Sequence, residues 1–233
     1  MKKYIRSFRL FLGAIPYKQA LIFLVVMAFF GVLFCVKDVL MSDSSDFVTG
    51  MFQGMSAMIG PVSTIIGVMQ LMTLYNSCSP ESPGYKFFRS IPDSGVHFSR
   101  AIIAGNVFAG AEGIVMLALV YVIFRLAGFD YSGVLLGALI LPFATGICNF
   151  AGFMKRNIAR VIWIVMVLTV SGFASGFLAG AAEDGEPTLA EMFMTDSLPF
   201  FIILAAGIIL FAVSMILSVR HVREKWGVDK CSD

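Results

Sequence analysis

The sequence predicts an all-α integral membrane protein with six transmembrane helices, an N-terminal amphipathic helix and a short helix between the second and third spans. Of its 233 residues, 58% are hydrophobic and only 14% are charged, against roughly 25% charged residues in an average soluble domain. Apolar runs of about 20 residues, the length that crosses a bilayer, recur six times. Basic residues gather in alternate connections between these runs, which is typical of multi-pass membrane proteins.

The first 19 residues predict an amphipathic helix that lies along the membrane interface. Basic residues alternate here with Tyr4, Ile5, Phe8 and Leu12, a pattern typical of interfacial helices. The charged region of a signal peptide is a less favoured interpretation, because the region is long and no small-residue cleavage site follows the first apolar run.

The six apolar runs predict one transmembrane domain over residues 1–233, since no stretch outside them is long enough to fold separately. The predicted spans are residues 20–36, 52–75, 101–124, 134–153, 161–182 and 198–219. Residues 220–233 are predicted to form a tail.

The basic residues also predict the orientation. Fifteen of the 17 Lys and Arg residues lie in four segments, residues 1–19, 79–100, 154–160 and 220–233, whereas only Lys37 and Arg125 lie in the other connections. By the positive-inside rule both termini are cytoplasmic, and we expect a multi-pass protein of the cytoplasmic (inner) membrane. The basic side is interpreted as a surface that faces anionic membrane lipid and not nucleic acid.

The segment of residues 79–100 predicts a short, rigid helix. Ser82 is a good N-cap, Pro83 suits the first helical position, and Pro92 ends the helix. Three apolar residues recur at every third position and form one stripe: Tyr85, Phe88 and Ile91. Lys86 and Arg89 are predicted to point away from this stripe.

Glu112 is the only carboxylate within a predicted span, where a charge costs at least ~2.5 kcal/mol. Gly105, Ala109 and Met116 share its helix face, so we expect Glu112 to point into the bundle. The sequence leaves two interpretations open. Glu112 either binds a substrate or a proton, or it is a protonated acid that is hydrogen-bonded to a neighbouring helix.

Gly172, Gly176 and Gly180 follow one another at four-residue spacing in the fifth predicted span. Small residues on one stripe allow a second helix to approach closely within a membrane. This stripe predicts a helix interface, either within the chain or between two copies.

No motif of an enzyme is present in the sequence. The four cysteines lack metal-ligand spacing, the two histidines stand alone, and no GxxxxGK[ST] loop occurs. We therefore expect a chain that is not an enzyme by itself, has no catalytic residues and binds no metal or cofactor.

The second-to-third-span connection reads GYKFFRSIPDSGVHFSRA. Together with the topology, it resembles the permease subunits of ABC-2-type ABC transporters, the small six-span kind found in bacterial exporters. In that family a basic and aromatic helix precedes an R-S-[LI]-P-x-S stretch, which corresponds here to residues 89–94. The resemblance covers the whole predicted topology, although the chain has neither the large outer domain nor the fused ATPase of some members, which makes a sterol or polysaccharide substrate less expected.

The resemblance implies a coupling helix that sits in a groove of a separate nucleotide-binding subunit. Its residues are Tyr85, Lys86, Phe87, Phe88, Arg89, Ser90, Ile91 and Pro92. Two copies of that ATPase subunit would bind ATP and Mg²⁺, and a second permease chain, identical or related, would complete the transporter. The implied substrate is hydrophobic or amphipathic, with an antimicrobial peptide as the best guess.

Two other classes of protein remain open. A secondary transporter driven by an ion gradient would use Glu112 and show internal pseudo-symmetry, but the two halves of this sequence differ in their connections. A toxin-immunity membrane protein would bind its toxin without transport and without an ATPase partner.

Overall fold

The protein is helical throughout the part that the computed structural model describes, namely residues 1–13, 15–36, 67–127, 132–154, 158–163, 165–167, 169 and 197–225. Of these residues 91% are helical and none is in a strand, which confirms the all-α prediction. The elements are α1 (Lys2–Leu12), α2 (Ile15–Cys35), the helical residues 67–77, α5 (Tyr85–Ser90), α6 (Ser94–Ala127), α7 (Ser132–Asn149), the 3-10 helix η1 (Phe150–Phe153), the helical residues 158–163 and α10 (Ser197–Lys225).

Three helices in the described part are long and apolar enough to cross a membrane: Ser94–Leu126, Gly133–Phe153 and Ser197–Glu224. A bent pair, Lys2–Leu12 with Tyr17–Leu33, is a fourth candidate. The chain therefore has the character of a membrane protein. Most of the predicted spans 52–75 and 161–182 falls outside the described residues, so the total of six spans stays a prediction.

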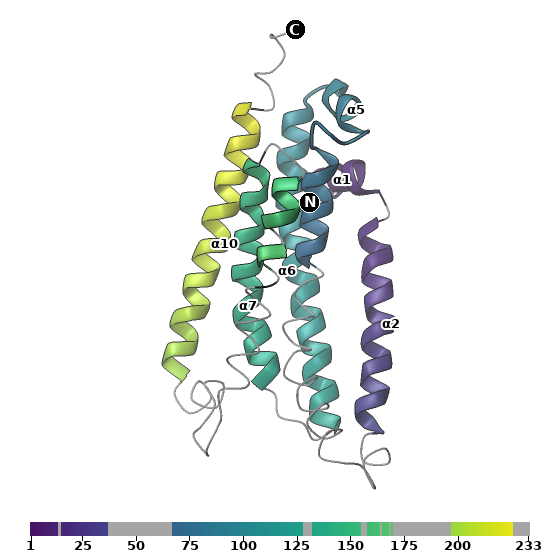
Figure 1. Ribbon diagram of the computed structural model, residues 1–233, viewed down its shortest axis with the longest axis vertical. Coiled ribbons are helices and arrows are strands. Elements are labelled where there is room, and N and C mark those ends of the chain that lie inside the picture. The colour runs from purple at the N-terminus through teal and green to yellow at the C-terminus, as the bar shows by residue number, and fades with distance from the viewer. Residues whose placement is uncertain are drawn as a thin grey trace.

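The axes of the long helices α2, α6, α7 and α10 are roughly aligned with one another (Figure 1). We call the end of the bundle where α1, α5 and the last turns of α10 lie the α5 end. From the α5 end, α2 and α6 run to the opposite end, while α7 and α10 run back towards it (Figure 1). These directions are the ones that the predicted topology requires, and they bring the described parts of the basic segments to one end.

Two helices are longer than the predicted spans. α6 begins at Ser94, ahead of the predicted span that starts at residue 101, and the carbonyl of Asp93 accepts the first backbone hydrogen bonds of the helix. Asp93 has a φ of 55°, a left-handed conformation that aspartate tolerates better than most residues. α10 continues to Lys225, so the first part of the predicted tail is helical.

α1 lies across the α5 end, and the chain bends by 82° between it and the helix that follows (Figure 1). Its buried residues are Ser7, Phe8, Phe11 and Leu12. The amphipathic prediction is therefore correct, but Phe8 and Phe11 of the apolar face contact α6 and α5, while Tyr4 and Ile5 are exposed. The helix ends at Leu12 and not at residue 19. The next residue, Gly13, takes a φ of 58°.

Glycine allows close helix contacts in the described part of the bundle. A Cβ on Gly146 of α7 would lie 3.1 Å from the backbone of Phe211 in α10, and a Cβ on Gly67 would lie 2.9 Å from the carbonyl oxygen of Ala109 in α6. Small residues thus bring these backbones together, as is common in membranes. The predicted stripe of Gly172, Gly176 and Gly180 lies outside the described residues.

Candidate functional site

α5 is shorter than the sequence predicts. It begins at Tyr85 and not at Pro83, because the chain first passes through a turn in which the N–H of Tyr85 donates to the carbonyl of Ser82 (3.0 Å). Gly84 is the N-cap, and no side chain caps the helix. A Cβ on Gly84 would lie 2.9 Å from the ring of Phe88, so the absence of a side chain makes room for that ring.

The inner face of α5 is held by a chain of aromatic contacts. The ring centroid of Phe88 lies 4.8 Å from that of Phe11 in α1, and Phe11 lies 5.3 Å from Phe98 in α6. Tyr85 and Ile91 are half-buried on the same helix. The predicted apolar stripe therefore faces the protein, and through it α5 is fixed to two other helices.

The outer face of α5 is formed by residues that lie outside the apolar stripe. The side chain of Phe87 is 63% exposed, and Lys86, Ser90 and Pro92 are exposed beside it. Arg89 was predicted to point away from the apolar stripe, but it contacts a member of that stripe: its Nη1 donates to the Tyr85 hydroxyl at 2.9 Å and its guanidinium lies 5.3 Å from the Tyr85 ring centre. Residues four apart on a helix are neighbours, which explains this contact.

A buried arginine ties the segment after η1 to the helix that leads into α5. Arg160 is 6% exposed; its Nη1 donates to the carbonyl of Tyr75 at 2.6 Å and its Nε to the carbonyl of Met154 at 2.9 Å. Burial lowers the pKa of the Arg160 guanidinium, but an arginine stays protonated at neutral pH. Its charge lies at the C-terminal end of the helical residues 67–77, where the helix dipole favours a cation.

A network of buried polar side chains joins four helices. The hydroxyl of Tyr75 donates to Asn149 Oδ1 at 2.9 Å, and Asn149 exchanges hydrogen bonds of 2.8 and 3.0 Å with Asn106 of α6. Two serines of α10 complete it, with Ser214 Oγ 3.3 Å from Asn149 Nδ2 and Ser218 Oγ 3.0 Å from the Tyr75 hydroxyl. None of the five is more than 1% exposed. We call these five residues the asparagine network.

The asparagine network was not predicted from the sequence, although a signal was present. Asn106 and Asn149 both lie within predicted spans, 101–124 and 134–153. An amide in hydrocarbon needs a hydrogen-bond partner, so two amides in separate spans indicate an interhelical contact. The sequence could not say that they pair with each other.

Glu112 points into the bundle and is 8% exposed, as its helix face predicts. Gln70 Nε2 donates to Glu112 Oε2 at 2.6 Å. The other oxygen of each group, Gln70 Oε1 and Glu112 Oε1, is buried without a hydrogen-bond partner. A proton on Glu112 Oε1 would turn that oxygen into a donor, and a protonated acid can donate to an amide oxygen while it accepts from the amide nitrogen. This is the arrangement that the hydrogen-bonded interpretation of Glu112 requires.

Within the described residues, no three His, Cys, Asp or Glu side chains come close enough together to hold a metal ion. Two candidate functional sites stand out: the outer face of α5 and the Gln70–Glu112 pair. The asparagine network joins the helices that carry them. Comparisons of the chain with protein-family models, curated proteins and solved structures found no match.

We predict that Asn149→Ala destabilises the protein by about 2–3 kcal/mol, because it removes several interhelical hydrogen bonds that are each worth roughly 0.6–1.7 kcal/mol in membranes. Unfolding in mixed detergent micelles measures this change. Ser218→Ala is the matched control, since it leaves the two asparagines paired, and we expect it to cost less than about 1 kcal/mol. Equal losses for the two variants would contradict a central role for Asn149.

We predict that Glu112→Gln keeps the stability of the protein, because a glutamine amide can replace the acid in a reciprocal pair with Gln70. Glu112→Leu leaves the Gln70 amide buried without a partner and should cost about 1–3 kcal/mol. The same unfolding measurement compares the two variants. If Glu112→Gln is as destabilising as Glu112→Leu, the reciprocal pair is wrong.

Proposed function

We propose that the chain is the permease subunit of an ATP-driven ABC exporter of the ABC-2 type in the cytoplasmic membrane. The observation that carries this proposal is the arrangement of α5. It is a short helix at the end of two longer helices, with its inner face fixed by Phe88 and its outer face open at Phe87 and Lys86. A helix of this kind can receive a movement from a soluble partner and pass it into the bundle.

The contacts of α5 support a rigid transmission. Phe88 joins it to α1 through Phe11, and Phe11 continues to Phe98 near the start of α6. On its other side, the helical residues 67–77 are held at Tyr75 by Arg160. A displacement of α5 would therefore move several helices together.

The energy in this proposal comes from a partner, because the sequence contains no GxxxxGK[ST] loop. Two nucleotide-binding subunits would bind ATP and Mg²⁺, and their closure around the nucleotide would push on the outer face of α5. A second permease chain would form the other half of the transporter. The substrate proposed from the family resemblance is a hydrophobic or amphipathic compound, foremost a peptide.

The Gln70–Glu112 pair favours a second candidate, a transporter driven by a proton gradient. A buried acid with one unpartnered oxygen could gain and lose a proton during a transport cycle. The two candidate functions differ in what transport requires. A gradient-driven transporter fails when Glu112→Gln removes the titratable group, whereas an ABC exporter fails when its ATPase partner is lost.

We predict that an ATPase subunit co-purifies with the wild-type chain and that the double variant Lys86→Ala, Phe87→Ala loses it. Both side chains are exposed, so their removal should leave the fold intact while it weakens the contact at least tenfold, as expected when an aromatic anchor worth about 2 kcal/mol is lost. Affinity purification in mild detergent, with mass spectrometry to identify a partner that has a GxxxxGK[ST] sequence, measures this loss.

Val96→Ala is the matched control, because Val96 is also exposed but lies on α6, outside the outer face of α5. It should retain the ATPase at the level of the wild type. The captured subunit should also hydrolyse ATP faster with the wild-type chain than with the double variant. Well-folded protein that captures no ATPase in either form would overturn the proposal.

A further inference from the structure

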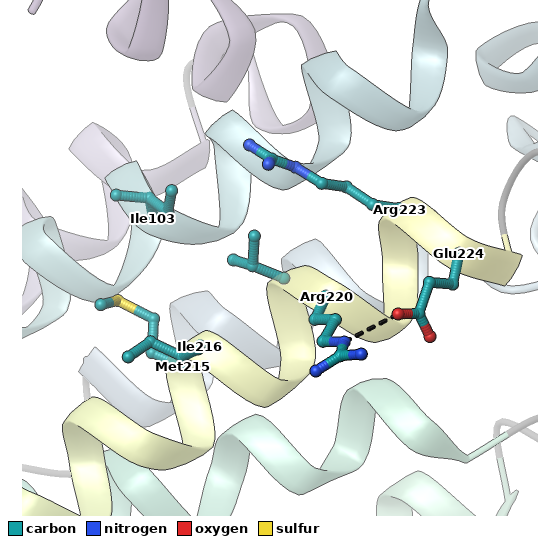
Figure 2. Close-up of a pocket in the computed structure, with 7 residues that line it drawn as sticks. Ile103, Met215, Ile216, Arg220, Arg223 and Glu224 are labelled. Atoms are coloured by element: carbon teal, nitrogen blue, oxygen red, sulfur yellow. Dashed lines mark hydrogen bonds and ion pairs between the residues drawn. The ribbon is translucent and has the colours of Figure 1, made fainter.

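A shallow pocket of about 360 Å³ lies between α6 and α10, close to the α5 end of the bundle. It is lined by Ile103, Met215, Ile216, Val219, Arg220, Arg223 and Glu224. Ile103 is the contribution of α6, while the other six residues come from the last turns of α10. Figure 2 shows the apolar side chains of Ile103, Met215 and Ile216 in one part of the pocket and the charged ones in the other.

The pocket has two chemically distinct halves, in a fixed order along α10. Met215, Ile216 and Val219 come first, and the charged residues Arg220 and Arg223 follow. At 1.5 Å per residue, Ile216 and Arg220 are about 6 Å apart along the helix axis. This order, apolar and then basic, matches a phospholipid in one leaflet, whose acyl chains lie below its phosphate.

One positive charge of the pocket is left without a counter-charge. Arg220 Nε donates to Glu224 Oε1 at 2.8 Å, and these two charges neutralise each other. Arg223 has no acidic partner among the described residues, and its side chain extends from α10 towards α6 (Figure 2). The pocket therefore carries a net charge of +1, which suits a ligand with a negative headgroup.

The apolar half of the pocket continues into the outer surface of α10. Ile209 is 64% exposed and Ile216 is 61% exposed on this candidate membrane span. In a bilayer these side chains contact acyl chains, so a lipid reaches the pocket by lateral diffusion. Most of the basic residues that the structure describes lie at the α5 end, and anionic lipids concentrate at the membrane surface that such residues mark.

From this geometry we propose that the pocket between α6 and α10 binds an anionic phospholipid, with the phosphate at Arg223 and an acyl chain along Ile103, Ile216 and Val219. Arginine suits this position because its stem packs on apolar side chains while its guanidinium binds phosphate. The proposal stands independently of the ATPase partner, since none of these residues belongs to α5.

The test compares lipid binding by the purified full-length chain in detergent. Dioleoyl phosphatidylglycerol and dioleoyl phosphatidylcholine are titrated separately, and native mass spectrometry gives the dissociation constant of each. We expect tighter binding of phosphatidylglycerol. Arg223→Ala should weaken this binding about fivefold, the contribution of one basic residue at a membrane surface. It should weaken phosphatidylcholine binding less, because the choline charge already offsets the phosphate of that lipid.

Two variants keep the test free of folding effects. Glu224→Gln releases Arg220 from its ion pair, so it should strengthen phosphatidylglycerol binding by a similar factor, which a damaged fold would not do. Lys3→Ala removes an exposed basic residue of α1, outside the pocket, and should change nothing. Equal affinity of the wild type for the two lipids, or unchanged phosphatidylglycerol binding in Arg223→Ala and Glu224→Gln, would overturn the proposal.

Discussion

The asparagine network is the interaction on which the rest of the structure depends. Hydrocarbon offers no hydrogen bonds, so a buried amide within a membrane must find its partners inside the protein. Asn106 and Asn149 meet this constraint by bonding to each other, to Tyr75 and to the serines of α10. Four helices are thereby fixed in register at one level, because a shift of any helix by one residue would leave a buried polar group unpaired.

This register also fixes the base of α5. The helical residues 67–77 and α6 flank α5 in the chain, and both contribute to the asparagine network through Tyr75 and Asn106. Arg160 binds the carbonyl of Tyr75, while Phe88 rests on Phe11 of α1. α5 is thus supported by the two helices that flank it in the chain and by α1, and Phe87 is left exposed. That asymmetry is the physical basis of the proposed coupling role.

Local patterns in the sequence predict much of the fold but little of the site. Hydropathy locates the described helices, and the Lys and Arg residues indicate which connections share an end. The asparagine network joins residues that are 43 and 74 positions apart, and such pairings have no local pattern. The apolar face of α1 was predicted, but not its contact with α6, since composition alone does not distinguish a lipid neighbour from a protein one. Arg89 was misplaced because spacing shows a helix face and not the reach of a long side chain.

The most direct test of the coupling role is photo-cross-linking from α5. A benzophenone amino acid replaces Phe87 in one variant and Phe88 in another, and the cross-linked products are identified after irradiation in native membranes. The account predicts that position 87 cross-links to a nucleotide-binding subunit, while position 88 cross-links within the chain to α1. Cross-links from position 87 to lipid alone, or the same products from both positions, would contradict it.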